Sequence, residues 1–249
     1  MSGHSKWANI KHKKEATDKK KGKIFSRFAK EIMVAARTGG GNPADNARLR
    51  TVLAAARAGN MPRENIDRAI KKGTGELTGA NFEEITYEGY GPGGTALLVE
   101  CLTDNRNRTA GEIRMLFDRN NGNMAGSGAV MWMFNRKARF VISGEYADEE
   151  KLMDIVLDAG ADDIQAEEGM AEISGAPDRF GDLAKALEDK GIKTEDAGIV
   201  QVPQDTIEIK DPELAKKIQK LVDALEDCDD AQAVYSNHEI DADILNSIS

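Results

Sequence analysis

The chain has 249 residues, 40% of them hydrophobic and 31% charged, with a formal net charge of −9. This length predicts roughly two domains of about 150 residues each, and the apolar content is sufficient for a folded core. No window approaches the roughly 18 consecutive apolar residues of a membrane helix, and the basic N-terminus lacks the apolar stretch of a secretory signal. We therefore expect a cytoplasmic protein in which Cys101 and Cys228 are buried thiols and do not form a disulfide.

The charge is distributed unevenly along the chain. Residues 1–72 contain 18 Lys and Arg against 6 Asp and Glu, whereas residues 73–249 contain 16 against 37. Salt screens charges over about 8 Å, so the two parts do not cancel if the basic part projects further than that. The separation of charge predicts a polyanionic partner for the N-terminal part, and nucleic acid is the first candidate.

The first thirty residues carry nine Lys and one Arg but only two acids. Before Ile24 the only large apolar residues are Trp7 and Ile10, too few to offset the entropy of ordering the rest. We interpret residues 1–23, which we call the basic arm, as a cationic segment that binds an anionic surface. Trp7 either stacks on a base or ribose or packs with Ile10 against the following helices, and the sequence favours neither.

Three short helices are predicted after the arm. Apolar residues recur at helical spacing over 24–37, Asn42-Pro43 predicts the start of a second helix that ends at Gly59, and Pro62 opens a third that ends at Gly73. Together they predict a small bundle. Its outward faces carry Arg48, Arg50, Arg57, Arg63, Arg68, Lys71 and Lys72.

Strands dominate after residue 73. Segments 82–90 and 95–103 flank a tight Gly-Pro-Gly-Gly reversal, a capping box at Thr109 and Glu112 predicts a helix, and 130–134 predicts a strand. Segment 138–203 follows the order βαββαβ of a ferredoxin-like sandwich. The tail adds a predicted strand near 206–209, a helix at 212–226 and a strand at 231–235, which are too few elements for a domain of its own.

We therefore predict an α+β fold with an N-terminal three-helix bundle followed by two α+β (ferredoxin-like) domains, one inserted in the other. The expected domains are 1–80, the basic helical domain; 81–137 with 204–249, the middle domain; and 138–203, the inserted domain.

No motif in the sequence supports catalysis. Residues 89–94 match G-x-G-x-x-G, but a strand follows them, so no helix N-terminus can meet a pyrophosphate and a hairpin turn is expected. The three histidines do not converge with other ligands at metal-binding spacing, and no nucleophile has a recognisable setting. We expect no enzymatic activity, no cofactor and no metal.

A second candidate site precedes the helix predicted at Thr109. Arg106 and Arg108 beside a helix N-terminus suit a phosphate, although they can equally serve loop solubility. The Gly-rich loop 122–128 is a further place where RNA can approach closely. The predicted nucleic-acid-binding residues are Lys6, Trp7, Lys11, His12, Lys13, Lys14, Lys19, Lys20, Lys21, Lys23, Arg27, Arg106 and Arg108.

Several blocks of this sequence resemble the YebC/PmpR family over essentially the full chain. They are GHSKWANIKHKK at 3–14, KGKIF at 21–25, NMP at 60–62, YEGYGPGG at 87–94, TDNRNRT at 103–109 and WMF at 132–134. The resemblance implies a helical domain, a middle domain and an inserted domain. It also implies a bacterial cytosolic regulator of transcription that binds promoter DNA. Mitochondrial relatives are translational activators of cytochrome oxidase subunit I, and the family is linked to ribosomes stalled on proline-rich sequence.

The sequence thus predicts a nucleic-acid-binding regulator of gene expression that binds DNA through its basic arm and helical domain. The alternative is a ribosome-associated translation factor that binds RNA and relieves stalled synthesis. No helix presents a clear major-groove face of Arg, Asn and Gln, so the residues do not favour DNA over RNA. Expected partners are DNA or RNA and, in the alternative, the ribosome, with no membrane and no small-molecule substrate. An adaptor that uses the acidic domains to bind protein is the remaining hypothesis.

Overall fold

The computed structural model describes residues 21–79, 81–167 and 169–248. Its mixture of helices and antiparallel sheets confirms the predicted α+β class. The chain forms two compact units: residues 134–202 make one, and the described residues up to Met133, with those from Pro203 onward, make the other.

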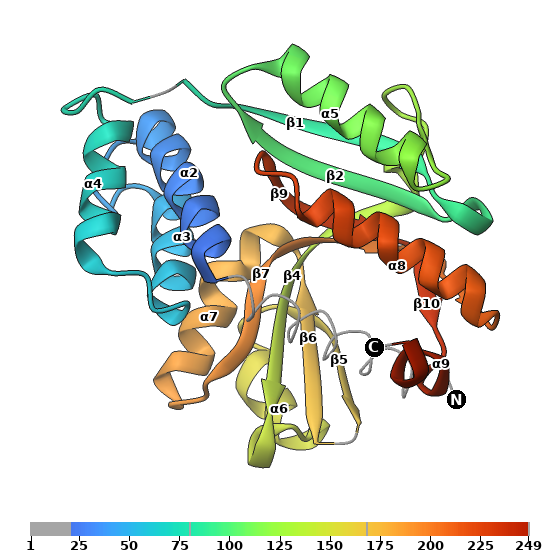
Figure 1. Ribbon diagram of the computed structural model, residues 1–249. Coiled ribbons are helices and arrows are strands. Elements are labelled where there is room, and N and C mark those ends of the chain that lie inside the picture. The colour runs from blue at the N-terminus through green and yellow to red at the C-terminus, as the bar shows by residue number, and fades with distance from the viewer. Residues whose placement is uncertain (1–20, 80, 168, 249) are drawn as a thin grey trace. The chain divides into compact units, whose positions relative to one another are not determined.

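The larger unit begins with a three-helix bundle, which confirms the predicted N-terminal architecture (Figure 1). Ile32, Leu49, Leu53 and Ala56 are almost fully buried in its core. The bundle consists of α2 (Lys21–Gly39), α3 (Ala47–Ala58) and α4 (Arg63–Gly73).

The predicted start of the second helix at Asn42 is wrong. Helix α3 begins several residues later because Asn46 caps it: its Oδ1 accepts a hydrogen bond from the backbone N–H of Leu49 at 2.9 Å. The Asn46 amide also donates to the carbonyls of Ala35 and Gly40, both at 2.8 Å. Asn42 instead closes a turn with Asp45. An N-cap side chain that also bonds the preceding helix fixes the bundle more firmly than a cap facing solvent.

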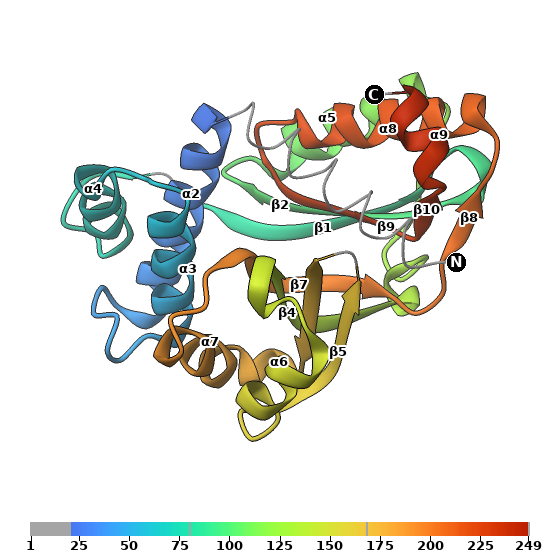
Figure 2. The same cartoon turned by 90° about the horizontal axis from the view of Figure 1, so that it is seen from below.

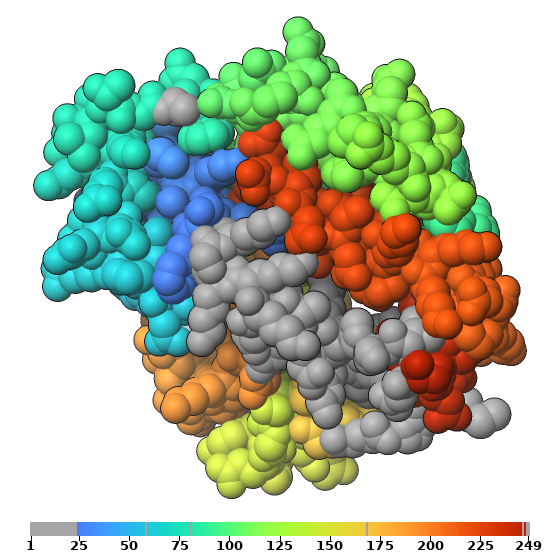
Figure 3. Space-filling model, in the orientation of Figure 1, coloured from blue at the N-terminus to red at the C-terminus, as the bar shows by residue number. Residues whose placement is uncertain are grey.

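A four-stranded antiparallel sheet forms the second part of the larger unit, in the order β3-β1-β2-β9. Helices α5 and α8 cover the same face of this sheet (Figure 2), and their surfaces adjoin in the space-filling view (Figure 3). Strand β9 pairs with β2, so segments more than 100 residues apart in sequence lie side by side. The elements are β1 (Glu83–Tyr90), β2 (Ala96–Thr103), α5 (Arg106–Arg119), β3 (Asn123–Met124), α8 (Pro212–Glu226) and β9 (Ala231–Ser236).

The core between sheet and helices contains Leu97, Val99, Phe117 and Leu221, all fully buried, together with the two cysteines. Both cysteines are free and buried, as predicted. Beside this core lies a small parallel pair, β8 (Ile207–Ile209) with β10 (His238–Ile240), followed by α9 (Ala242–Ile248). The sequence patterns predicted neither β10 nor α9.

Two predicted boundaries in this part are wrong. Helix α5 begins at Arg106, three residues before the predicted capping box, because Asn105 is its N-cap and accepts from the backbone N–H of Arg108. The predicted strand at 130–134 is instead a 3-10 turn, Met131–Met133, that leads into a longer strand. The Gly-rich motif after β1 forms the expected reversal, and Gly93 has a positive φ of 72° that favours glycine.

The smaller unit has the element order βαββαβ and the sheet order β5-β6-β4-β7, which confirms the ferredoxin-like prediction. Its core contains Phe140 and Phe180, whose rings stack with centroids 4.8 Å apart. The elements are β4 (Phe134–Ser143), α6 (Glu149–Val156), β5 (Ala161–Glu167), β6 (Met170–Gly175), α7 (Phe180–Asp189) and β7 (Thr194–Pro203).

Candidate nucleic-acid interface

Most of the predicted arm residues lie outside the described part of the chain. This applies to Lys6, Trp7, Lys11, His12, Lys13, Lys14, Lys19 and Lys20. Lys21 and Lys23 belong to the first turn of α2, and only their backbone is described. Their assignment to nucleic-acid binding stays a prediction.

The remaining three predicted residues, Arg27, Arg106 and Arg108, belong to helices near the sheet. The Arg27 guanidinium donates a hydrogen bond of 2.6 Å to the carbonyl oxygen of Glu226, at the end of α8. Arg106 is exposed in the first turn of α5, as is Arg108, whose guanidinium contacts the carboxylates of Asp104 and Asp230 at 3.0 and 2.7 Å. Arg27 and Arg108 therefore make contacts within the larger unit. Arg106 is exposed and is the one of the three whose side chain makes no such contact with the described residues.

Asp230 is the centre of a polar cluster that sequence reasoning missed. This buried carboxylate accepts hydrogen bonds from Lys30 on α2, Arg108 on α5 and the Thr109 hydroxyl, at 2.7–2.9 Å. Burial alone raises the pKa of a carboxyl, but the donors outweigh it and hold the pKa of Asp230 well below its usual range. No local sequence signal marks this cluster because its members are up to 200 residues apart.

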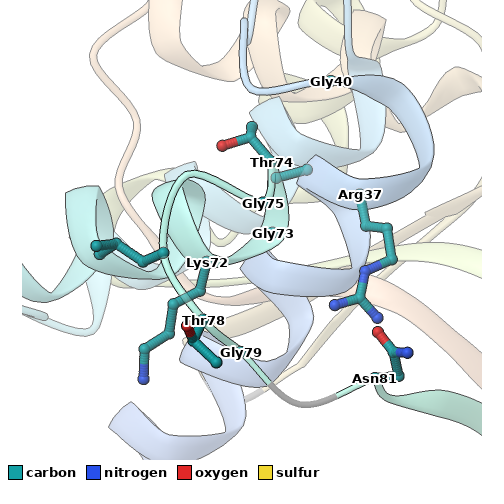
Figure 4. A pocket seen from close by; sticks show the side chains of 11 residues that line it. Arg37, Gly40, Lys72, Gly73, Thr74, Gly75, Thr78, Gly79 and Asn81 are labelled. Carbon is teal, nitrogen blue, oxygen red and sulfur yellow. The ribbon is translucent and has the colours of Figure 1, made fainter.

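Two cations of the bundle line an open hollow of about 590 Å³ between the end of α2 and the segment after α4. They are Arg37 and Lys72, and the lining also includes Thr78 and Asn81. In Figure 4 the Arg37 guanidinium points toward the side chain of Asn81, and Lys72 extends beside Thr78. None of the described lining residues is acidic. A cation-lined hollow with hydroxyl and amide donors suits phosphate oxygens.

A second hollow of about 220 Å³ lies between α2 and α4, and Lys72 also borders it. Its floor includes Phe25, Met33 and Met61, while Arg68 and Lys72 are among its charged lining residues. The two hollows together form a surface that we call the α2–α4 groove. In such a surface the cations can contact phosphates, and the apolar floor can contact bases.

Other cations of the bundle are tied to nearby groups. Arg48 pairs with Glu84 on β1, Arg50 donates to the carbonyls of Pro43 and Ala44, and Arg63 lies 3.8 Å from Asp67. Such exposed contacts contribute little to stability. They leave Arg57, Arg68, Lys71 and Lys72 as the cations most available on the described bundle surface.

A loop anchored by Glu88 is the second feature that the sequence did not reveal. The buried Glu88 carboxylate accepts hydrogen bonds from the backbone N–H groups of Gly128, Val130 and Met131 at 2.6–2.8 Å. Burial acts to raise the pKa of Glu88, but the backbone donors prevail and lower it. The loop presents Trp132 with 66% of its surface exposed. The signal available in the sequence was a tryptophan beside a Gly-rich segment without charge.

Other site types receive little support from the described residues. Within 21–79, 81–167 and 169–248, no group of three His, Cys, Asp or Glu lies where it could hold a metal ion. Burial raises the pKa of both thiols, Cys101 and Cys228, which keeps them protonated at neutral pH. No described helix is long and apolar enough to cross a membrane.

Two family models match the chain. Residues 5–76 match the TACO1/YebC protein N-terminal domain, and residues 82–238 match the TACO1/YebC second and third domain. The chain belongs to the TACO1/YebC family. This confirms the family suggested by the sequence motifs.

Relatives within the TACO1/YebC family are similar over their full length. A protein of Syntrophobacter fumaroxidans is 51% identical over 249 residues, which is 100% of both chains, and one of Treponema pallidum is 52% identical over 98% of this chain and 100% of its own. Both are named "Probable transcriptional regulatory protein". The crystal structure of a conserved hypothetical protein from Aquifex aeolicus is 45% identical, with a TM-score of 0.80 over 88% of this chain and 90% of that chain.

Proposed function

We propose that this protein is a non-enzymatic regulator of gene expression that binds nucleic acid through its basic arm and the α2–α4 groove. The observation that carries the proposal is the separation of charge, with 18 Lys and Arg against 6 acids in residues 1–72 of an otherwise acidic chain. Such a segment neutralises phosphates, and this supplies affinity for nucleic acid that does not depend on the base sequence. The names of the relatives, which describe transcriptional regulators, support the regulatory role.

The α2–α4 groove supports this proposal independently of the arm. Lys72 borders both of its hollows, and no acidic side chain is among the described lining residues of either. A nucleic-acid strand bound by the arm can continue along the groove, because the last residues of the arm belong to the first turn of α2. We propose the arm as the main electrostatic contact and the groove as its extension.

The test is the salt dependence of nucleic-acid binding, measured by fluorescence anisotropy with labelled DNA and RNA. Replacing Lys11, Lys13 and Lys14 with Gln should weaken binding and reduce the slope of log K against log salt by about 0.7–0.9 for each phosphate that is no longer neutralised. Lys72→Gln should reduce the slope by the amount expected for one phosphate, about 0.7–0.9. Lys185→Gln, an exposed lysine on α7 of the smaller unit, is the matched control and should leave the slope unchanged. An unchanged slope in the arm variant would refute the proposal.

Promoter DNA is the target that we propose first, and RNA on the ribosome is the alternative. A promoter regulator prefers one duplex over a scrambled duplex at about 150 mM salt, whereas a translation factor sediments with ribosomal particles in a gradient. In the second case, deletion of residues 1–23 should release the protein from the particles. The exposed Trp132 favours the RNA alternative, because the bases of a duplex already stack on one another and cannot stack on this side chain.

A further inference from the structure

Trp132 is the most exposed of the large hydrophobic side chains in the described residues. Its indole N–H donates a hydrogen bond of 3.1 Å to the carbonyl of Ala129, within its own loop. Its backbone carbonyl accepts from the side-chain amide of Gln204 at 2.8 Å. The indole N–H and the backbone carbonyl of Trp132 are thus engaged within the unit, while 66% of the residue's surface stays exposed.

The loop holds this ring in place. Three backbone N–H groups are fixed by the buried carboxylate of Glu88, and the hydroxyl of Tyr90 donates to the carbonyl of Ala129 at 3.2 Å. The Gln204 backbone N–H donates to the carbonyl of Met133 at 2.8 Å. An aromatic ring fixed before binding loses little conformational entropy when a ligand stacks on it. A hydrophobic side chain exposed only by chance does not require such a framework.

The loop that carries Trp132 has no charged side chain of its own. Residues 120–133 contain no Asp, Glu, Lys or Arg, although residues 73–249 as a whole carry 37 acids. A Cβ added to Gly126 or Gly128 would meet nothing within 4 Å, so the loop surface is open there. A phosphate backbone that approaches the loop meets no carboxylate of the loop itself, and the buried carboxylate of Glu88 beneath it is already bonded by three backbone N–H groups.

We propose that Trp132 is a stacking platform for an unpaired base of single-stranded nucleic acid. This inference rests on the proposed nucleic-acid binding and deepens its RNA alternative, since it specifies single strands over duplexes. Bases in a duplex already stack on their neighbours, whereas an unpaired base offers its π-face to an aromatic side chain. The arm supplies phosphate contacts to any nucleic acid, and Trp132 adds the preference for an unpaired base.

Fluorescence provides a direct test because the chain has two tryptophans, Trp7 and Trp132. In a Trp7→Phe background the emission comes from Trp132 alone. A single-stranded oligonucleotide of about 12 residues should quench this emission, and the duplex of the same sequence should quench it far less. Equal quenching by both, or none by the single strand, would overturn the proposal.

Affinity gives the second measurement. In the same background, Trp132→Ala should weaken binding of the single strand by about 5- to 100-fold, and Trp132→Phe should restore most of it. Leu157→Ala, with 62% exposure in the smaller unit, is the matched control and should change nothing. Thermal denaturation of each variant verifies the fold.

The outcomes separate this inference from the proposed function. If the unaltered protein binds no nucleic acid at low salt, the proposed function itself fails. If it binds and Trp132→Ala binds the single strand equally well, only the stacking platform is refuted, and a protein surface becomes the better ligand for Trp132.

Discussion

The ammonium group of Lys30 on α2 lies 2.9 Å from the carboxylate of Asp230, which directly precedes β9. The same ammonium donates to the backbone carbonyl of Asp229 at 2.8 Å. These bonds join the first described helix to the last strand of the sheet, across 200 residues of sequence. Both side chains are largely buried, so the pair fixes the bundle to the sheet with little competition from water.

Replacing Asp230 with Asn should lower the free energy of unfolding by about 2–4 kcal/mol. The change leaves the Lys30 ammonium largely buried without its counter-charge and weakens the bonds from Arg108 and Thr109. Urea denaturation measures the effect. Asp229→Asn, at the exposed neighbouring residue, is the control and should stay within about 0.5 kcal/mol of the unaltered protein.

The effect of Asp230 should also depend on pH. Its pKa is depressed in the folded protein, so its stabilising contribution is present above the unfolded value of about 3.9 and is lost as the pH falls through the folded pKa. The stability difference between the unaltered protein and Asp230→Asn should therefore be constant from about pH 6 to 8 and shrink below about pH 4. A difference that grows on acidification would contradict this assignment.

Glu31 on α2 should show the opposite pH dependence. Burial raises the pKa of its carboxyl, an effect that neighbouring Arg48 only partly offsets. A raised pKa means that the folded state is favoured by protonation, so this contribution is lost as the pH rises through the folded pKa. Glu31→Gln should gain stability relative to the unaltered protein at about pH 7 but not at about pH 4. Glu64→Gln, at an exposed residue in the first turn of α4, is the control for the same measurement by thermal denaturation.

Gly73 should not tolerate a side chain. A Cβ at this position would lie 2.5 Å from the carbonyl oxygen of Met33 and 2.8 Å from the Cβ of Ala36, so α4 would have to move away from α2. Gly73→Ala should cost about 1–3 kcal/mol. Gly111→Ala in α5 is the control: its Cβ meets nothing within 4 Å, and higher helix propensity should stabilise it by up to about 1 kcal/mol.

Glu88→Gln should release the loop that presents Trp132. An amide accepts more weakly than a carboxylate and offers only one oxygen to three backbone N–H groups, so we expect a loss of about 1–3 kcal/mol. In a Trp7→Phe background the loosened loop should make Trp132 more accessible to acrylamide. Glu83→Gln, exposed on the same strand, should change neither stability nor quenching. Unaltered quenching in Glu88→Gln would show that the carboxylate does not hold the loop.

Local patterns predicted most elements of the fold. Helix α8 has the predicted bounds because Asp211 is an N-cap and Pro212 suits the first helical position. The helix starts at 42 and 109 were misplaced because several residues near each start have good capping chemistry, and only packing selects among them. Asn46 was selected by its bonds to Ala35 and Gly40, and Asn105 by the turn before α5. The three-domain division remains a prediction.

The sequence by itself determined the family, the α+β class, the βαββαβ order and the separation of charge, because these depend on local periodicity and residue type. The tertiary structure alone decided that Asp230 gathers Lys30, Arg108 and Thr109, and that Glu88 holds the loop of Trp132. These clusters depend on distances between residues far apart along the chain. Such distances follow from strand pairing and helix packing, which no local pattern specifies.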